Sequence, residues 1–135
     1  MQLNRSTDYA IQMLVYLAKA GKTVSSSKLA AAIDVSHRYL LQISAKLRAA
    51  EFIRAAHGPS GGLALDKAPE EISLYDVILG MEGIIKTGEI CGVPSDEVSK
   101  EMLMLKNEYR KVDCMLERVL KEITLARIME ADLYL

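Results

Sequence analysis

The sequence predicts a mainly α-helical fold with a small β-hairpin, a winged helix-turn-helix followed by a long C-terminal helix. Between residues 24 and 50, apolar residues recur at helical spacing in two short segments that are joined by a tight turn. A hairpin with a glycine-rich tip follows, up to residue 65. A heptad pattern begins near residue 95. We therefore expect a winged helix-turn-helix domain at residues 1–83, a loop at 84–94, and a dimerisation helix with a C-terminal tail at 95–135.

Composition limits the class of protein. Half of the 135 residues are apolar, which excludes a disordered chain, and no apolar run approaches the ~20 residues that cross a membrane. The first residues show no signal-peptide pattern, so we expect a cytoplasmic protein without membrane contacts. The two cysteines, Cys91 and Cys114, are too few for a disulfide-built fold and lack zinc-ligand spacing. We therefore expect no structural metal.

Charge is divided between the two halves of the chain, although the net charge is only −1. Residues 1–68 carry nine Lys or Arg against four Asp or Glu, a balance of +5, and residues 69–135 carry eight against fourteen, a balance of −6. A basic half is the pattern expected if that half alone meets phosphate groups. The acidic half, which contains the long helix, is then expected to join two subunits.

The first two helices are expected from their capping signals. Residues 6–8 look like the cap of a helix that runs to Ala18 and is followed by the breaker Gly21. Its apolar positions are spread so broadly that neighbours must cover it on more than one side. A short second helix starts at Ser26 or Ser27, whose hydroxyl can accept a hydrogen bond from an unpaired backbone N–H.

The third helix has the pattern of a recognition helix. After a turn at residues 34–35, Ser36 is placed to cap it. One stripe is apolar and predicted to be buried, and it consists of Leu40, Ile43 and Leu47. The opposite stripe consists of His37, Arg38, Leu41, Gln42 and Ala45. Its long polar groups lie in the first two turns, where such a helix meets base edges and where the helix N-terminus favours phosphate.

The hairpin is expected from apolar runs at residues 52–56 and 63–65, separated by a turn whose glycines permit positive φ. A hairpin of this size must pack on the neighbouring helices. The alternatives are a helix-turn-helix used only for packing and a protein-binding winged helix. Beyond the hairpin, Ser73 and Asp76 resemble a capping box that opens a helix ending at Gly83.

The last helix carries a heptad seam from Asp96 to Ile123 without Gly or Pro. The seam consists of Val98, Met102, Leu105, Tyr109, Val112, Leu116, Val119 and Ile123. A helix of this length, about 40 Å, is too long for a small domain to cover, so the seam predicts a homodimer. The alternative is an amphipathic helix that lies along its own domain, and the two uses can coexist because the flanking apolar residues are free to touch the body.

Several segments together resemble the Rrf-two family, the IscR, NsrR and CymR type of bacterial transcriptional regulators. These segments are MQLNRSTDYAIQMLVYLA, DVSHRYLLQISAKLRAAEFI, HGPSGGLAL, APEEISLYDVILGMEG and ITLARI. No single segment is specific, but their order and spacing are, and they cover almost the whole chain. The resemblance implies a homodimeric winged-helix repressor or activator that binds double-stranded operator DNA.

The resemblance also implies roles for individual residues. Arg38, Leu41 and Gln42 would face bases, with Ser36 and Tyr39 near the DNA backbone. The wing tip would meet the minor groove through His57, Ser60, Gly61 and Gly62. Two positions depart from the family pattern. His57 stands where many relatives have arginine, and Glu51 stands where relatives usually have a helix-ending glycine.

Sensing relatives hold an iron–sulfur cluster on three cysteines in the loop and at the start of the long helix. Cys91 matches the first of these, but the others are absent, and the histidines that serve some relatives are assigned here to the DNA surface. Asp8 resembles a carboxylate ligand of part of the family, which does not complete a site. We therefore expect no iron–sulfur cluster. Cys91 is either a vestigial loop cysteine or a thiol sensor near Lys86.

Cys114 is expected to pack as a small residue between the long helix and the body. The leading functional hypothesis is a sequence-specific, dimeric transcription regulator whose effector is a small molecule, a partner protein or thiol oxidation. The competing hypotheses are a winged-helix protein-interaction module that has lost DNA binding, and a redox-sensing regulator that uses Cys91 as a thiol or a cluster ligand. No enzyme is expected, because no catalytic motif rises above chance.

Overall fold

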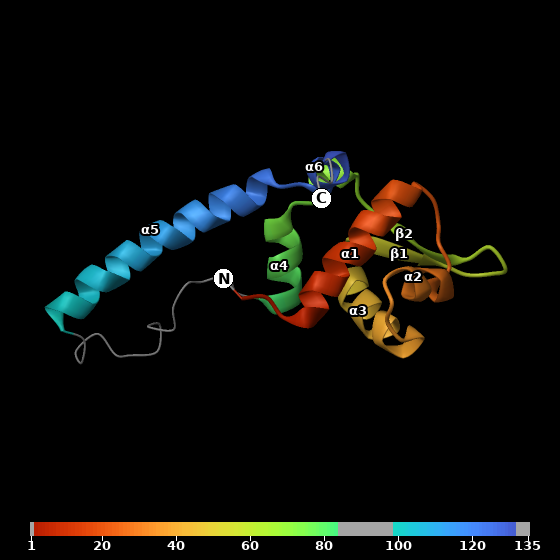
Figure 1. Cartoon of the computed structure of the whole chain (residues 1–135), viewed down its shortest axis with the longest axis horizontal. Helices are drawn as coiled ribbons and strands as arrows, with labels where there is room; N and C mark the ends of the chain where they lie inside the picture. Colours follow the sequence, from red (N-terminus) through yellow and green to blue (C-terminus); the bar gives the residue numbers. More distant parts are fainter. Residues whose placement is uncertain (1, 84–98, 132–135) are drawn as a thin grey trace.

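The computed structural model describes residues 2–83 and 99–131. Its elements are α1 (Arg5–Ala20), α2 (Ser26–Ala32), α3 (His37–Ala49), β1 (Ile53–Ala56), β2 (Gly62–Leu65), the 3-10 turn η1 (Pro69–Glu71), α4 (Leu74–Glu82), α5 (Lys100–Glu122) and α6 (Leu125–Glu130). In Figure 1, α1 to α4 and the hairpin form a body, α5 runs away from it, and α6 lies against it. This is the predicted mainly helical winged helix-turn-helix with a long C-terminal helix.

The three predicted N-terminal helices are present, but the starts of α1 and α2 differ from the predicted ones. α1 begins at Arg5 after Asn4, which makes no side-chain cap bond, and the predicted cap residue Thr7 is fully buried inside the helix. The helix ends at Gly21, which is left-handed (φ 63°) as the sequence predicts. α2 is capped by Ser25, whose Oγ accepts from the Lys28 N–H at 3.2 Å, and not by either of the two serines that follow it.

The core forms around α1, which packs against α3, α4, α6 and β2. Because these neighbours cover α1 on more than one side, its apolar residues are spread around much of the helix. The largest fully buried apolar side chains are those of Met13, Leu14, Leu17, Leu29, Leu40, Ile43, Leu47, Ile72, Val77, Ile78 and Leu125. No helix among the described residues is both long and apolar enough to span a membrane.

The hairpin is anchored to the body by a third extended segment. β1 and β2 are antiparallel, with Ile53 opposite Leu65 and Ala56 opposite Gly62. Val24, which precedes α2, pairs with Leu63 through two backbone hydrogen bonds of 2.8 Å each. This bridge supplies the packing that a two-stranded hairpin needs for stability.

α4 and α5 are joined at the body end of α5. Ser73 and Asp76 form the predicted capping box at the start of α4, and Gly83 ends that helix. At the start of α4, the Leu74 N–H donates to the carbonyl oxygen of Ile123, which follows α5, at 2.8 Å, and Ile123 has the extended backbone of a helix end. Ile123 therefore lies one residue beyond the end of α5, and its place in the seam stays a prediction.

Candidate nucleic-acid interface

The third helix, α3, presents two different faces. Leu40, Ile43 and Leu47 are buried, at most 2% exposed. The stripe that faces away from the core is exposed and includes Arg38, Leu41, Gln42 and Ala45. Leu41 is 46% exposed although it is apolar, so burial in this chain does not account for it. The helix thus offers a surface with cationic, amide and apolar groups in its first two turns.

The N-terminal end of α3 is held by side-chain contacts. Ser36 caps the helix as predicted, its Oγ accepting from the Tyr39 N–H at 3.1 Å. The exposed His37 places Nε2 2.7 Å from Ser26 Oγ, which links the starts of α2 and α3. The half-buried Tyr39 packs edge-on against the Tyr9 ring of α1, with ring centroids 5.8 Å apart. These contacts orient α3 relative to the body.

The wing tip depends on glycine backbone geometry. His57 and Ser60 are exposed, as expected of a surface loop. A Cβ on Gly61 would lie 2.4 Å from the Ala56 oxygen, and one on Gly62 would lie 2.1 Å from the Val24 oxygen. Both distances are shorter than real Cβ contacts allow. The two glycines therefore shape the hairpin and let it approach the segment before α2.

A groove of about 560 Å³ separates α3 from the wing. It is lined by the serines at the start of α2, by Leu41, Ser44 and Arg48 of α3, and by hairpin residues 55–58 and 61–63. Leu41 and His57, for which the family resemblance implies two different contacts with DNA, thus border one groove. Arg48 lines it as well, and sequence reasoning did not single this residue out.

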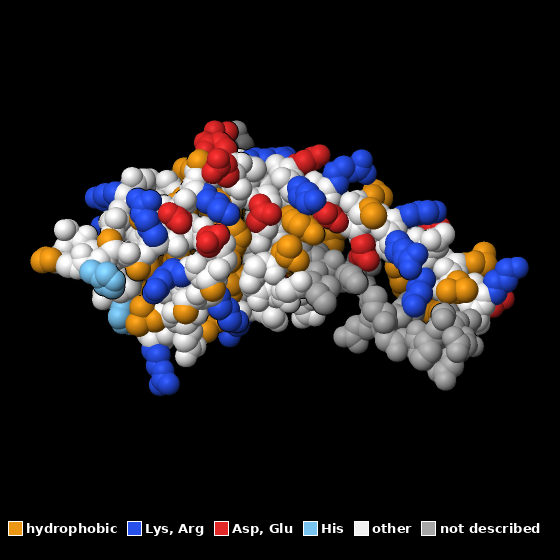
Figure 2. All heavy atoms as spheres, turned by 180° about the vertical axis from the view of Figure 1, so that it is seen from behind, with side chains coloured by type: hydrophobic (Ala, Val, Ile, Leu, Met, Phe, Trp, Pro, Cys, Tyr) orange, Lys and Arg blue, Asp and Glu red, His pale blue; other side chains and the backbone are white. Residues whose placement is uncertain are grey.

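The charge distribution refines the division seen in the sequence. In Figure 2, acidic side chains gather over the middle of the body, whereas Lys, Arg and His side chains mark the wing end. The acidic excess of the C-terminal half does not lie in α5, which carries six Lys or Arg and five Asp or Glu. It lies in residues 69–99, with seven acidic residues and one basic residue. The long helix itself is therefore nearly neutral, which corrects the expectation of an acidic subunit-joining segment.

The apolar seam of α5 is open to solvent in a single chain. Met102, Leu105, Tyr109, Val112 and Val119 are 36 to 52% exposed, and Leu116 is half-buried. Within α5 only Leu120 is buried. The alternative of a helix lying along its own domain is therefore wrong for this part of the chain. Val98, the first predicted seam residue, lies outside the described residues.

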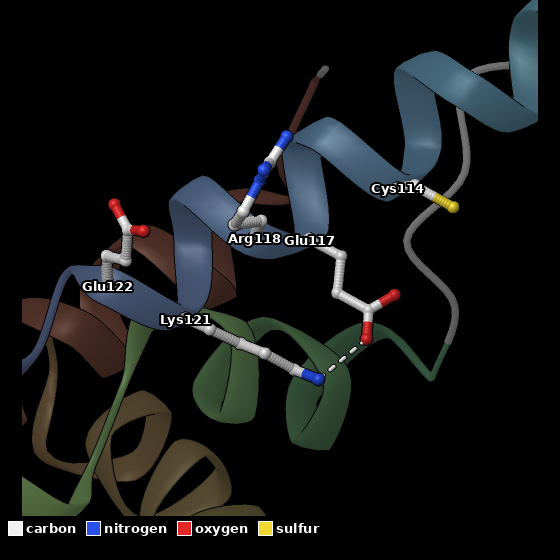
Figure 3. Close-up of a pocket in the computed structure, with 5 residues that line it drawn as sticks. All are labelled: Cys114, Glu117, Arg118, Lys121 and Glu122. Carbon is white, nitrogen blue, oxygen red and sulfur yellow. Dashed lines mark ion pairs between the residues drawn. The ribbon is translucent and has the colours of Figure 1, made fainter.

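The side of α5 away from the seam carries Cys114, which is exposed. It lines a shallow pocket of about 450 Å³ together with Glu117, Arg118, Lys121 and Glu122, whose side chains Figure 3 shows along α5. Cys114 does not pack against the body, which corrects the expectation from the sequence. Nearer the body, Lys121 pairs with Glu117 at 2.7 Å and lies 4.8 Å from the Tyr75 ring centroid of α4. The hydrogen bond from Lys121 to the Glu117 carboxylate raises the pKa of Lys121.

The profile of the Rrf2 family, described as iron-dependent transcriptional regulators, matches residues 3–131. The chain belongs to the Rrf2 family. A protein of Mycobacterium tuberculosis assigned as the HTH-type transcriptional regulator Rv1287 is 29% identical over 130 residues, which cover 95% of this chain and 81% of that protein. The structure of T. potens IscR is 28% identical with a TM-score of 0.75, covering 96% and 87% of the two chains.

The structure of CymR, the global cysteine regulator of B. subtilis, has a TM-score of 0.82 at 24% identity, covering 98% of this chain and 99% of that one, and shows the same fold. Rrf2 membership makes this chain a transcriptional regulator with a winged-helix DNA-binding fold, and not an enzyme. The predicted family and fold class are thereby confirmed. The roles assigned to individual residues stay predictions.

The Rrf2 description raises the question of an iron site. Among residues 2–83 and 99–131, no group of three or more His, Cys, Asp or Glu side chains is placed to hold a metal ion. Cys114 is exposed on α5, and both histidines lie at the interface of α2, α3 and the wing. The described side chains therefore do not fit an iron–sulfur cluster. Cys91 and the predicted loop at 84–94 lie outside these residues.

Proposed function

We propose that this Rrf2 regulator binds a pseudo-palindromic DNA site as a homodimer, using α3 and the wing of each subunit. The observation that carries the proposal is the exposed stripe of α3 beside the wing, while the opposite stripe of the same helix is buried. A helix held in this way can enter the major groove without disturbing the core. The basic balance of residues 1–68 supports attraction to phosphate.

The exposed stripe contains groups with distinct base preferences. Arg38 can pair bidentately with guanine, and Gln42 can do so with adenine. Leu41 can contact only a thymine methyl group. At the wing, His57 is a weaker minor-groove reader than arginine when its imidazole is neutral. Specificity therefore rests mainly on α3.

The homodimer is inferred from α5. Its seam exposes five large apolar side chains along a helix that extends away from the body (Figure 1). A second copy of the same helix can cover this seam by heptad packing. Two-fold symmetry would then place two α3 helices on two half-sites of one DNA molecule.

The regulator is proposed to act in the cytoplasm. It is also proposed to hold no iron–sulfur cluster, because no group of three or more His, Cys, Asp or Glu among the described residues is placed to hold a metal ion and Cys91 is the one further cysteine of the sequence. Its signal is then a small molecule, a partner protein or oxidation of the Cys91 thiol. The visible spectrum of protein purified without oxygen tests the cluster. Absorption between roughly 400 and 600 nm together with bound iron and sulfide would contradict the proposal.

The DNA-binding role is tested by the variant Arg38→Ala on two duplexes. One duplex is selected by the wild-type protein from a random library, and the other is a scrambled sequence of equal length and composition. Removing the pairing between Arg38 and a base should cost about 1–3 kcal/mol on the selected duplex and less on the scrambled one. Equal effects on both would make Arg38 a backbone contact. Failure of the wild type to bind any duplex would favour a protein-interaction module.

A further inference from the structure

The groove between α3 and the wing lies between two surfaces that are proposed to contact different grooves of DNA, α3 the major groove and the wing the minor groove. Leu41 lies on its α3 side and His57 on its wing side. In a duplex, neighbouring major and minor grooves are separated by one sugar–phosphate backbone. A protein that places α3 in one and the wing in the other must straddle that backbone. The groove of about 560 Å³ is the space between the two elements.

The chemistry of the groove fits a phosphodiester. None of the described residues that line it is acidic. Its lining includes small or apolar side chains such as Ala55 and Leu63, which can contact a deoxyribose. The Ser44 hydroxyl donates within α3, with the Leu40 and Leu41 oxygens at 2.9 and 3.1 Å, so it requires no partner from solvent. Ser25 and Ser26 also line the groove; the Ser25 hydroxyl oxygen accepts from the Lys28 N–H, and the Ser26 hydroxyl is hydrogen-bonded to His37.

Arg48 is the cation of this groove. It lies in the last turn of α3, and its side chain is exposed. It makes no ion pair or side-chain hydrogen bond with the residues that the structure describes. A guanidinium free of protein partners and bordering an acid-free groove is suited to bind phosphate oxygens through two N–H groups. A helix C-terminus also stabilises a cation, but that role does not require the side chain to line a groove.

We propose that the groove between α3 and the wing seats one DNA backbone and that Arg48 contacts a phosphate there as a positioning residue. This inference rests on the proposed DNA-binding function. Arg48 fixes the position of α3 and the wing on the duplex and does not read bases. Lys46, two residues earlier on the same helix, is exposed but does not line the groove, and it provides a matched control.

The test measures the affinity of wild type, Arg48→Ala and Lys46→Ala for a duplex selected by the wild type and for its scrambled counterpart, over a range of salt concentrations. Arg48→Ala should weaken binding to both duplexes by the same factor, about tenfold. The slope of log affinity against log salt should fall by about 0.9 for each phosphate that the variant no longer neutralises, one per subunit. Lys46→Ala should change both quantities less, and Arg48→Lys should restore part of the affinity.

The possible results separate this inference from the function on which it rests. If the wild type binds no duplex, the proposed function fails. If the wild type binds but Arg48→Ala matches Lys46→Ala in affinity and salt slope, the proposed contact between Arg48 and a phosphate is wrong. Weaker binding confined to the selected duplex would make Arg48 a base reader and would also overturn the inference. Equal thermal unfolding of the variants excludes misfolding, and Arg48→Lys supplies the comparison if Arg48→Ala is unstable.

Discussion

The substitution Gly62→Ala should detach the wing from the body. Gly62 has a φ of 153°, and a Cβ there would lie 2.1 Å from the Val24 oxygen and 2.5 Å from the Val24 carbonyl carbon. Both atoms are backbone, so no side-chain rotation relieves the collision. Val24 must move, which breaks its two 2.8 Å backbone hydrogen bonds with Leu63. Positive φ costs Ala about 1–2 kcal/mol, and breaking the two bonds adds about 2 kcal/mol.

Gly58→Ala is the matched control. Gly58 also has a positive φ, 103°, but a Cβ there meets nothing within 4 Å. This variant should therefore show only the backbone cost, about 1–2 kcal/mol. Urea unfolding followed by circular dichroism, at one protein concentration, measures both variants. Gly62→Ala should unfold at clearly lower urea than Gly58→Ala. Equal midpoints would refute the claim that the Val24 bridge holds the wing.

Three further changes test other parts of the structure. Glu51→Gly should stabilise the chain by about 1 kcal/mol in urea unfolding because Glu51 has a φ of 64°, whereas Ala49→Gly, inside α3, should destabilise it. Val112→Glu on the seam should convert dimer to monomer in analytical ultracentrifugation, and Cys114→Glu on the other side of α5 should not. Ser73→Ala should lower the free energy of unfolding by about 1 kcal/mol, because it removes the N-cap of α4. An unchanged free energy of unfolding would show that this cap does not stabilise the protein.

The spacing of apolar residues predicted which face of each helix is buried, because apolar residues recur in the sequence at helical spacing. The buried stripe of α3 and the capping box at Ser73 are both local patterns, and both are present in the structure. The family resemblance places Glu51 where relatives usually have a helix-ending glycine, and the structure gives Glu51 a positive φ of 64°. The first residue of each helix was harder to predict from the sequence. Ser25, Ser26 and Ser27 carry the same capping hydroxyl, so the sequence alone does not tell which of them caps α2; in the structure it is Ser25.

Features made by tertiary packing could not be read from the chain. Arg48 looks like an ordinary basic residue at a helix end, and only the position of the wing turns it into a groove residue. Cys114 was placed against the body by assumption, but α5 extends away from the body and leaves it exposed. Ile123 fits the heptad, yet its backbone pairs with Leu74 and ends the helix. Each of these depends on how segments distant in sequence pack together.

Selection of duplexes from a random library by the full-length protein tests the central claim most directly. The account predicts enrichment of one motif with two-fold symmetry, its half-sites centred about 10 base pairs, or a multiple of this, apart. The protein should bind this motif as a dimer. An absence of enrichment, or an enriched motif without two-fold symmetry, would contradict the account.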